Sequence, residues 1–122
     1  MDDIEKLKNY KVLYVEDDDI TREMASRMIS KYFRNIVIAA DGREGLEKFS
    51  SESPDLIITD LSMPEMSGFE MISHIREINK EVPIIVTTAY RNETESLDNV
   101  NAVVFKPVNK KLLLQAISDI YE

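Results

Sequence analysis

The 122-residue chain contains no cysteine, three glycines, four prolines and no long apolar run. The absence of cysteine excludes a disulfide framework, a thiolate metal site and a cysteine nucleophile. No run approaches the roughly 20 apolar residues that a membrane-spanning helix needs, and the Met-Asp-Asp start is unlike a signal peptide. We therefore expect a cytoplasmic protein that does not enter a membrane.

An excess of positive charge is also absent, since 23 Asp and Glu outnumber 15 Lys and Arg and give a net charge of −8. This balance argues against a broad binding surface for nucleic acid or anionic membranes. The hydrophobic fraction of 43% and charged fraction of 31% are ordinary for a globular protein. We expect one domain over residues 1–122, in which residues 1–10 form an N-terminal lead.

Five short apolar runs are rich in β-branched residues and predict strands at 12–15, 36–39, 56–58, 84–86 and 102–105. They do not alternate cleanly with polar residues, so they are typical of strands that are buried on both faces. Helical spacing of apolar residues fills the gaps, weakly over residues 92–98. The apolar faces expected in these helices are Ile20, Met24, Met28 and Tyr32; Leu46 and Phe49; Phe69, Ile72, Ile75 and Ile78; Leu97; and Leu113, Ala116, Ile117 and Ile120.

The alternation of strands and helices predicts an α/β fold of the (βα)5 type, with a doubly wound, five-stranded parallel sheet. Such sheets bind ligands beyond the carboxyl ends of their strands. Chemically active residues follow four of the five predicted strands. They are Glu16-Asp17, Asp60, Thr87-Thr88 and Lys106-Pro107.

Carboxylates that are gathered at one edge repel one another, so such a site needs a cation or raised pKa values. Oxygen ligands without a thiol favour a hard metal, and Mg²⁺ fits best. A lysine and a hydroxyl beside a metal-bound carboxylate indicate a phosphoryl group as the bound anion. Asp60, at the exit of the central strand, is the best candidate for a nucleophile that forms an acyl phosphate.

Each of these residues also has an ordinary structural interpretation. Asp18 and Asp19 are better explained as helix N-caps than as ligands. Asp60 could be a turn residue before Pro64, and Lys106 an exposed charge at a strand end. The convergence of all these positions on one edge of the sheet favours the functional interpretation.

The sequence resembles the receiver domain of two-component response regulators over about residues 10–121. The resemblance rests on four segments, which are VLYVEDD at 12–18, IITDLSMPEMSG at 57–68, Thr88-Ala89 and Lys106-Pro107. It implies a flavodoxin-like sheet with strand order 2-1-3-4-5.

The resemblance also implies roles for single residues. Asp60 corresponds to the phosphoacceptor and Asp17 to a direct Mg²⁺ ligand, while Glu16 would act through water and Ser62 through its backbone carbonyl. Thr88 corresponds to the switch hydroxyl and Lys106 to its salt-bridge partner. Pro64 belongs to the loop after the phosphoacceptor, Gly68 opens the next helix, and the Lys106-Pro107 bond is expected to be cis.

Two features concern how the switch works. Val103 stands where the family normally has Tyr or Phe, and it cannot swing between exposed and buried states as an aromatic ring does. Ser62 and Tyr90 occupy the positions that flank the path of the attacking water in the family. Since Ser62 is short and Tyr90 bulky, we expect slow self-dephosphorylation.

The resemblance therefore implies a signalling module and not a turnover enzyme. Its partners would be a sensor histidine kinase or phosphotransfer protein and a downstream protein or fused output domain, with a homodimer through the fourth helix, fifth strand and fifth helix as a further arrangement. A phosphate-independent docking module is the alternative that Val103 keeps open. A Mg²⁺-dependent phosphohydrolase would need an aspartate where Ser62 stands. A flavin-binding protein would need a phosphate-binding loop after the first strand, where this sequence is acidic.

Overall fold

The computed structural model describes residues 8–89 and 97–121 of the chain. Strands and helices alternate along most of this length. The elements are β1 (Lys11–Val15), α2 (Asp19–Ile29), β2 (Asn35–Ala39), α3 (Gly42–Glu52), β3 (Leu56–Asp60), α4 (Gly68–Ile78), β4 (Ile84–Thr88), β5 (Ala102–Phe105) and α5 (Lys110–Ile120).

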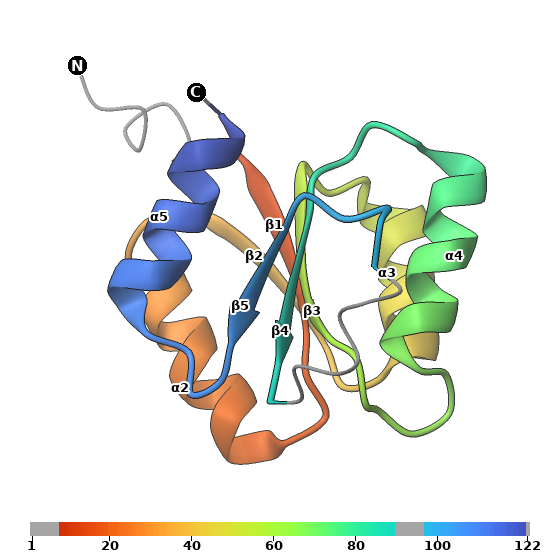
Figure 1. Ribbon diagram of the computed structural model, residues 1–122, viewed down its shortest axis with the longest axis horizontal. Coiled ribbons are helices and arrows are strands. Elements are labelled where there is room, and N and C mark those ends of the chain that lie inside the picture. Colours follow the sequence, from red (N-terminus) through yellow and green to blue (C-terminus); the bar gives the residue numbers. More distant parts are fainter. Residues whose placement is uncertain (1–7, 90–96, 122) are drawn as a thin grey trace.

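All strand pairs are parallel and the sheet order is β2-β1-β3-β4-β5, which confirms the predicted fold class. Helices α2 and α5 cover one face of the sheet, and α3 and α4 cover the other (Figure 1). Most of the helix expected at 92–98 cannot be compared with the structure, because residues 90–96 lie outside the described residues. None of the described helices has the length and hydropathy to cross a membrane.

The central strands β1, β3 and β4 are almost wholly buried, whereas the edge strands β2 and β5 are only partly covered. This is why the central runs lack polar alternation, since helices pack on both of their faces. The register pairs Asp60 with Thr87 and Thr88 with Phe105. The carboxyl ends of these strands therefore reach the same edge of the sheet.

The predicted buried face of α2 is wrong at its start, because Ile20 and Met24 are 72% and 68% exposed. The residues that pack against the sheet are Ala25, Met28 and Ile29. Residues spaced by four are offset by about 40° around a helix at each step. Met24 and Ile20 therefore lie progressively further from the face on which Met28 packs. The i, i+3 and i+4 spacing of the packed residues keeps them on one face.

The other helix predictions are largely confirmed. Ile72 and Ile75 are buried in α4, together with Met71, which the spacing argument omitted. Ile78 is exposed and not buried, because it is the last residue of the helix and lies beyond the packed turns. Asp18 caps α2 by accepting a hydrogen bond from Thr21 N–H, so the structure selects it over Asp19 as the N-cap.

Candidate functional site

Three carboxylates gather at the carboxyl edge of the sheet. Glu16 and Asp17 directly follow β1, and Asp60 is the last residue of the neighbouring strand β3. Each offers an oxygen, and these oxygens lie within 4.8 Å of one another. Glu16 is 1% exposed and Asp60 8%, whereas Asp17 is exposed. The sequence prediction that these acids converge is therefore confirmed.

Lys106 comes from the end of the edge strand β5 and contacts two of these acids. It follows β5, and its Nζ donates to Glu16 Oε1 at 2.8 Å and to Asp60 Oδ2 at 3.0 Å. Burial by itself would lower the pKa of Lys106, but the hydrogen bonds to the two carboxylates outweigh it and raise that pKa. Lys106 is therefore a firmly protonated cation beside Asp60.

The remaining carboxylate oxygens are held by the backbone. Asp60 Oδ1 accepts from Leu61 N–H at 2.7 Å, and Glu16 Oε2 accepts from Asp18 N–H at 3.1 Å. Burial raises the pKa of Glu16, and its bond to Lys106 opposes that shift. These contacts fix the orientation of both buried acids before any ligand binds.

The site opens as a shallow cavity of about 260 Å³ that is lined by Glu16, Asp17, Asp18, Asp60, Ser62, Ala89 and Lys106. Three carboxylates and one ammonium in the cluster leave two negative charges, which a divalent cation would neutralise. Hard oxygen donors without sulfur or imidazole suit Mg²⁺. The acidic pair and Asp60 therefore fit a magnesium site, with Ser62 beside it.

Two glycines hold the loop between β3 and α4 against the site. A Cβ atom at Gly68 would lie 2.2 Å from the carbonyl oxygen of Asp60, and one at Gly42 would lie 2.1 Å from the carbonyl oxygen of Met66. Gly68 N–H also donates to the Leu61 carbonyl at 2.8 Å. Only glycine permits these approaches, so Gly68 both opens α4 and lets the loop close over the end of β3.

Some predicted residues lie apart from the cavity. Thr88 is buried at the end of β4 and does not line it, although the Thr88 carbonyl accepts from Lys106 N–H at 2.8 Å. Val103 packs on the face covered by α3 and α4. Pro64 is exposed in the loop, and the Lys106-Pro107 peptide bond is cis, as expected. Tyr90 lies outside the described residues.

Sequence reasoning missed two side chains near this edge, Arg22 and Tyr14, and it did not foresee that the Thr87 hydroxyl would be buried. Arg22 of α2 hydrogen-bonds to the backbone of the acidic loop, and the only sequence signal was a cation in the first turn of a helix, where the helix dipole disfavours it. The hydroxyls of Tyr14 and Thr87 are buried and have no hydrogen-bond partner among the described residues. Burial also raises the pKa of Tyr14, so this hydroxyl stays protonated.

Comparison with known proteins gives consistent matches. The sequence profile of the response regulator receiver domain matches residues 12–118. Regulator of RpoS from Escherichia coli (strain K12) is 34% identical over 101 residues, which are 80% of this chain and 30% of that protein. Transcriptional regulatory protein GlrR from the same strain is 32% identical over 115 residues, 91% of this chain and 26% of that protein.

Solved structures share the fold over most of their length. Chemotaxis response regulator CheY4 of Vibrio cholerae is similar with a TM-score of 0.81 and 31% identity, covering 92% of this chain and 98% of that one. A CheX-CheY-BeF3-Mg²⁺ complex from Borrelia burgdorferi gives a TM-score of 0.85 and 27% identity, covering 93% and 90% of the two chains. The chain thus spans less than a third of the two curated regulators named above, but nearly all of the CheY4 chain.

Proposed function

Since the chain belongs to the response regulator receiver domain family, we propose that it accepts a phosphoryl group on Asp60 with the help of Mg²⁺. The observation that carries the proposal is the place of Asp60, whose carboxylate lies 3.0 Å from the Lys106 ammonium and beside Glu16 and Asp17. A partly buried carboxylate between a cation and two further acids suits a phosphoryl acceptor that binds a divalent metal. The related Borrelia burgdorferi complex holds BeF3 and Mg²⁺, which supports this assignment.

The proposed reaction transfers a phosphoryl group from an oxygen or nitrogen atom of the donor to a carboxylate oxygen of Asp60. A carboxylate oxygen of Asp60 forms the new bond to phosphorus, the bond between phosphorus and the donor breaks, and the donor leaves with that electron pair. A bound Mg²⁺ supplies neutralisation of the phosphoryl oxygens. Lys106 contributes a positive charge beside Asp60, and Leu61 N–H donates to the other Asp60 oxygen.

The direct test is the intact mass after incubation with acetyl phosphate and Mg²⁺. We expect one added phosphoryl group that hydroxylamine removes, no addition in Asp60→Asn, and none in wild type with EDTA. Asp55→Asn is a matched control, because Asp55 lies at the other end of β3 and accepts from Lys11 N–H. An undiminished mass gain in Asp60→Asn would falsify the assignment, and no gain in wild type would favour a phosphate-independent docking module.

The lifetime of the phosphoryl group is the second part of this proposal. Ser62 lines the cavity but is too short to orient an attacking water, and Tyr90 would cover the phosphoryl group. We expect Tyr90→Ala to lose its phosphoryl group faster than wild type, and Ser62→Asn with Tyr90→Glu to do the same. Decay of Tyr90→Ala at the wild-type rate would contradict this shielding role.

The proposed donor is a histidine kinase or phosphotransfer protein in the cytoplasm, and the proposed receiver of the signal is a downstream protein or a fused output domain. A groove of about 810 Å³ runs between β5 and α5 and includes Val103 and the exposed side chain of Leu112. Lys106 follows β5 directly and also lines this groove. Movement of its ammonium onto a phosphoryl group would therefore change the shape and charge of the groove. We propose that phosphorylation changes binding there, including binding of a second copy of the chain.

A further inference from the structure

The guanidinium of Arg22 reaches back from α2 to the loop that carries the acidic pair. Its Nη1 donates to the carbonyl oxygen of Glu16 at 2.8 Å and to that of Asp17 at 3.3 Å, and its Nη2 donates to Asp19 Oδ1. The Arg22 side chain is only 21% exposed. One cation therefore ties together three of the four consecutive acids from Glu16 to Asp19.

The position of Arg22 in the first turn of α2 is electrostatically unfavourable, so the contacts of its guanidinium must compensate for that cost. The N-terminal turn of a helix carries a partial positive charge, so it favours anions and disfavours an arginine. Helical side chains lean toward the N-terminus, and this brings the guanidinium onto the preceding loop. Its rigid fork of donors can serve two carbonyls and a carboxylate together, whereas a lysine ammonium binds as a point charge.

We propose that Arg22 is a positioning residue for Mg²⁺ binding, which orients the Asp17 carboxylate toward Asp60 by holding the peptide groups of Glu16 and Asp17. The inference rests on the proposed function of the site. Lys106 already fixes the side chains of Glu16 and Asp60. The exposed Asp17 depends instead on its backbone, and Arg22 is the side chain that binds the Asp17 carbonyl. Arg22 thus prepares the one acid of the cluster that Lys106 does not hold.

The sign of the effect separates this role from simple electrostatics. A guanidinium near a divalent cation repels it, so loss of the charge alone would tighten Mg²⁺ binding. Loss of the positioning contacts would weaken Mg²⁺ binding, as removal of outer partners of metal ligands does by about 10- to 100-fold. Arg22→Gln removes the charge and the fork, while Arg22→Lys keeps the charge and removes the fork.

The experiment is calorimetric titration of the unphosphorylated chain with Mg²⁺ alone. We expect both Arg22→Gln and Arg22→Lys to bind Mg²⁺ about tenfold more weakly than wild type. Arg27→Gln and Arg27→Lys are matched controls on the same helix, because the Arg27 guanidinium pairs with Glu23 and both side chains are well exposed. The controls should bind Mg²⁺ as wild type does. Unchanged or tighter binding in the Arg22 variants would overturn the inference.

A second readout distinguishes positioning of the metal site from general damage. The rate of phosphorylation by acetyl phosphate is measured against Mg²⁺ concentration. In Arg22→Lys the half-saturating Mg²⁺ concentration should rise about tenfold, while the rate at saturating Mg²⁺ stays within about twofold of wild type. A lowered plateau with an unchanged midpoint would contradict a positioning role. Failure of wild type to bind Mg²⁺ would refute the proposed function itself, and normal wild-type binding with unaffected Arg22 variants would refute only this inference.

Discussion

The two ends of the parallel sheet treat polar groups in opposite ways. At the carboxyl end, Glu16 and Asp60 are buried acids that share one lysine, and the hydroxyls of Tyr14 and Thr87 are buried with no partner among the described residues. The loop there also holds Glu65 at a φ of 67°, a left-handed conformation that a side chain disfavours and that Ser53 at the amino end shares with a φ of 48°. This end therefore contains features that lower stability.

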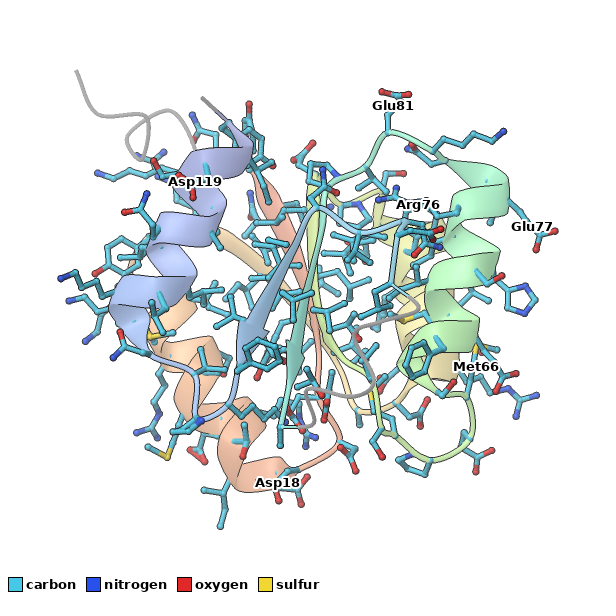
Figure 2. The ribbon with its side chains drawn as sticks, in the orientation of Figure 1. Asp18, Met66, Arg76, Glu77, Glu81 and Asp119 are labelled. Carbon is cyan, nitrogen blue, oxygen red and sulfur yellow. The ribbon has the colours of Figure 1, made fainter. Side chains whose placement is uncertain are left out.

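At the amino end, by contrast, polar groups are used to tie elements together. Arg76 of α4 donates to the carbonyl oxygens of Asn99 at 2.8 Å and Val82 at 2.7 Å. The Asn101 side chain accepts from Ile84 N–H at 2.9 Å, which holds the start of β4. Figure 2 shows Arg76 at the end of the molecule opposite to Asp18, which caps α2 beside the acidic pair.

The fold thus carries its binding site at one end of the sheet and secures its stability at the other. A charged ligand needs charged groups to bind it, so the site end keeps buried acids at some energetic cost. The opposite end has no such requirement and can satisfy its backbone. Substitutions at the two ends should therefore affect different measurements.

The largest effect is expected for Mg²⁺ binding after Asp17→Asn. Losing a carboxylate ligand should weaken Mg²⁺ binding by more than about 100-fold, beyond the range for outer partners of a ligand. Asp18→Asn should stay within a few-fold of wild type, because Asn also caps helices well and Asp18 serves Thr21 N–H. Equal losses in the two variants, measured by calorimetry, would contradict the assignment of Asp17.

At the amino end, Arg76→Met should lower the free energy of unfolding by about 2–3 kcal/mol, because the substitution leaves carbonyls of the tied segments without a donor. Urea denaturation of the variant would measure this loss. Mg²⁺ affinity should not change, since Arg76 lies far from the acidic pair. A clear fall in Mg²⁺ affinity without loss of stability would break the division of the molecule into two ends.

A smaller effect of the opposite sign is expected at the site end for Thr87→Val. Removing a buried hydroxyl that has no partner among residues 8–89 and 97–121 should raise the free energy of unfolding by about 1 kcal/mol. Thr59→Val is the matched control, because the Thr59 hydroxyl donates to the Asp60 carbonyl at 2.8 Å, and it should lower stability by about 1 kcal/mol. Destabilisation in both variants would show that Thr87 is satisfied in solution.

The smallest effect is expected for Glu65→Gly. Glycine relieves the left-handed strain at this position but also gains freedom in the unfolded chain, so the net increase in the free energy of unfolding should be about 0.5 kcal/mol. Glu65→Ala retains a Cβ atom and should give no such gain. If alanine stabilises as much as glycine, charge repulsion in the loop, and not backbone strain, is the relevant cost.

The element order, the parallel sheet and the residues at its carboxyl edge could all be predicted from the sequence. Strand positions followed from the apolar runs because strands that are buried on both faces leave little choice of residue. Convergence of Glu16, Asp60 and Lys106 followed from topology, since parallel strands end at the same edge. The N-cap at Asp18 was likewise readable, because capping is a contact between residues close in sequence.

The buried face of α2 and the sharing of charges at the edge became clear only from the packing of the elements. Ile20 and Met24 are as apolar as Met28, yet the rotation of α2 against the sheet leaves them in solvent. The Arg22 side chain bends back onto the acidic loop, and the Thr87 hydroxyl has no partner in the described part of the chain; both outcomes depend on distances of a few ångströms that the sequence does not encode. Periodicity in the sequence encodes which face a residue occupies, but hydrogen bonds depend on side-chain conformations that form only when the elements pack.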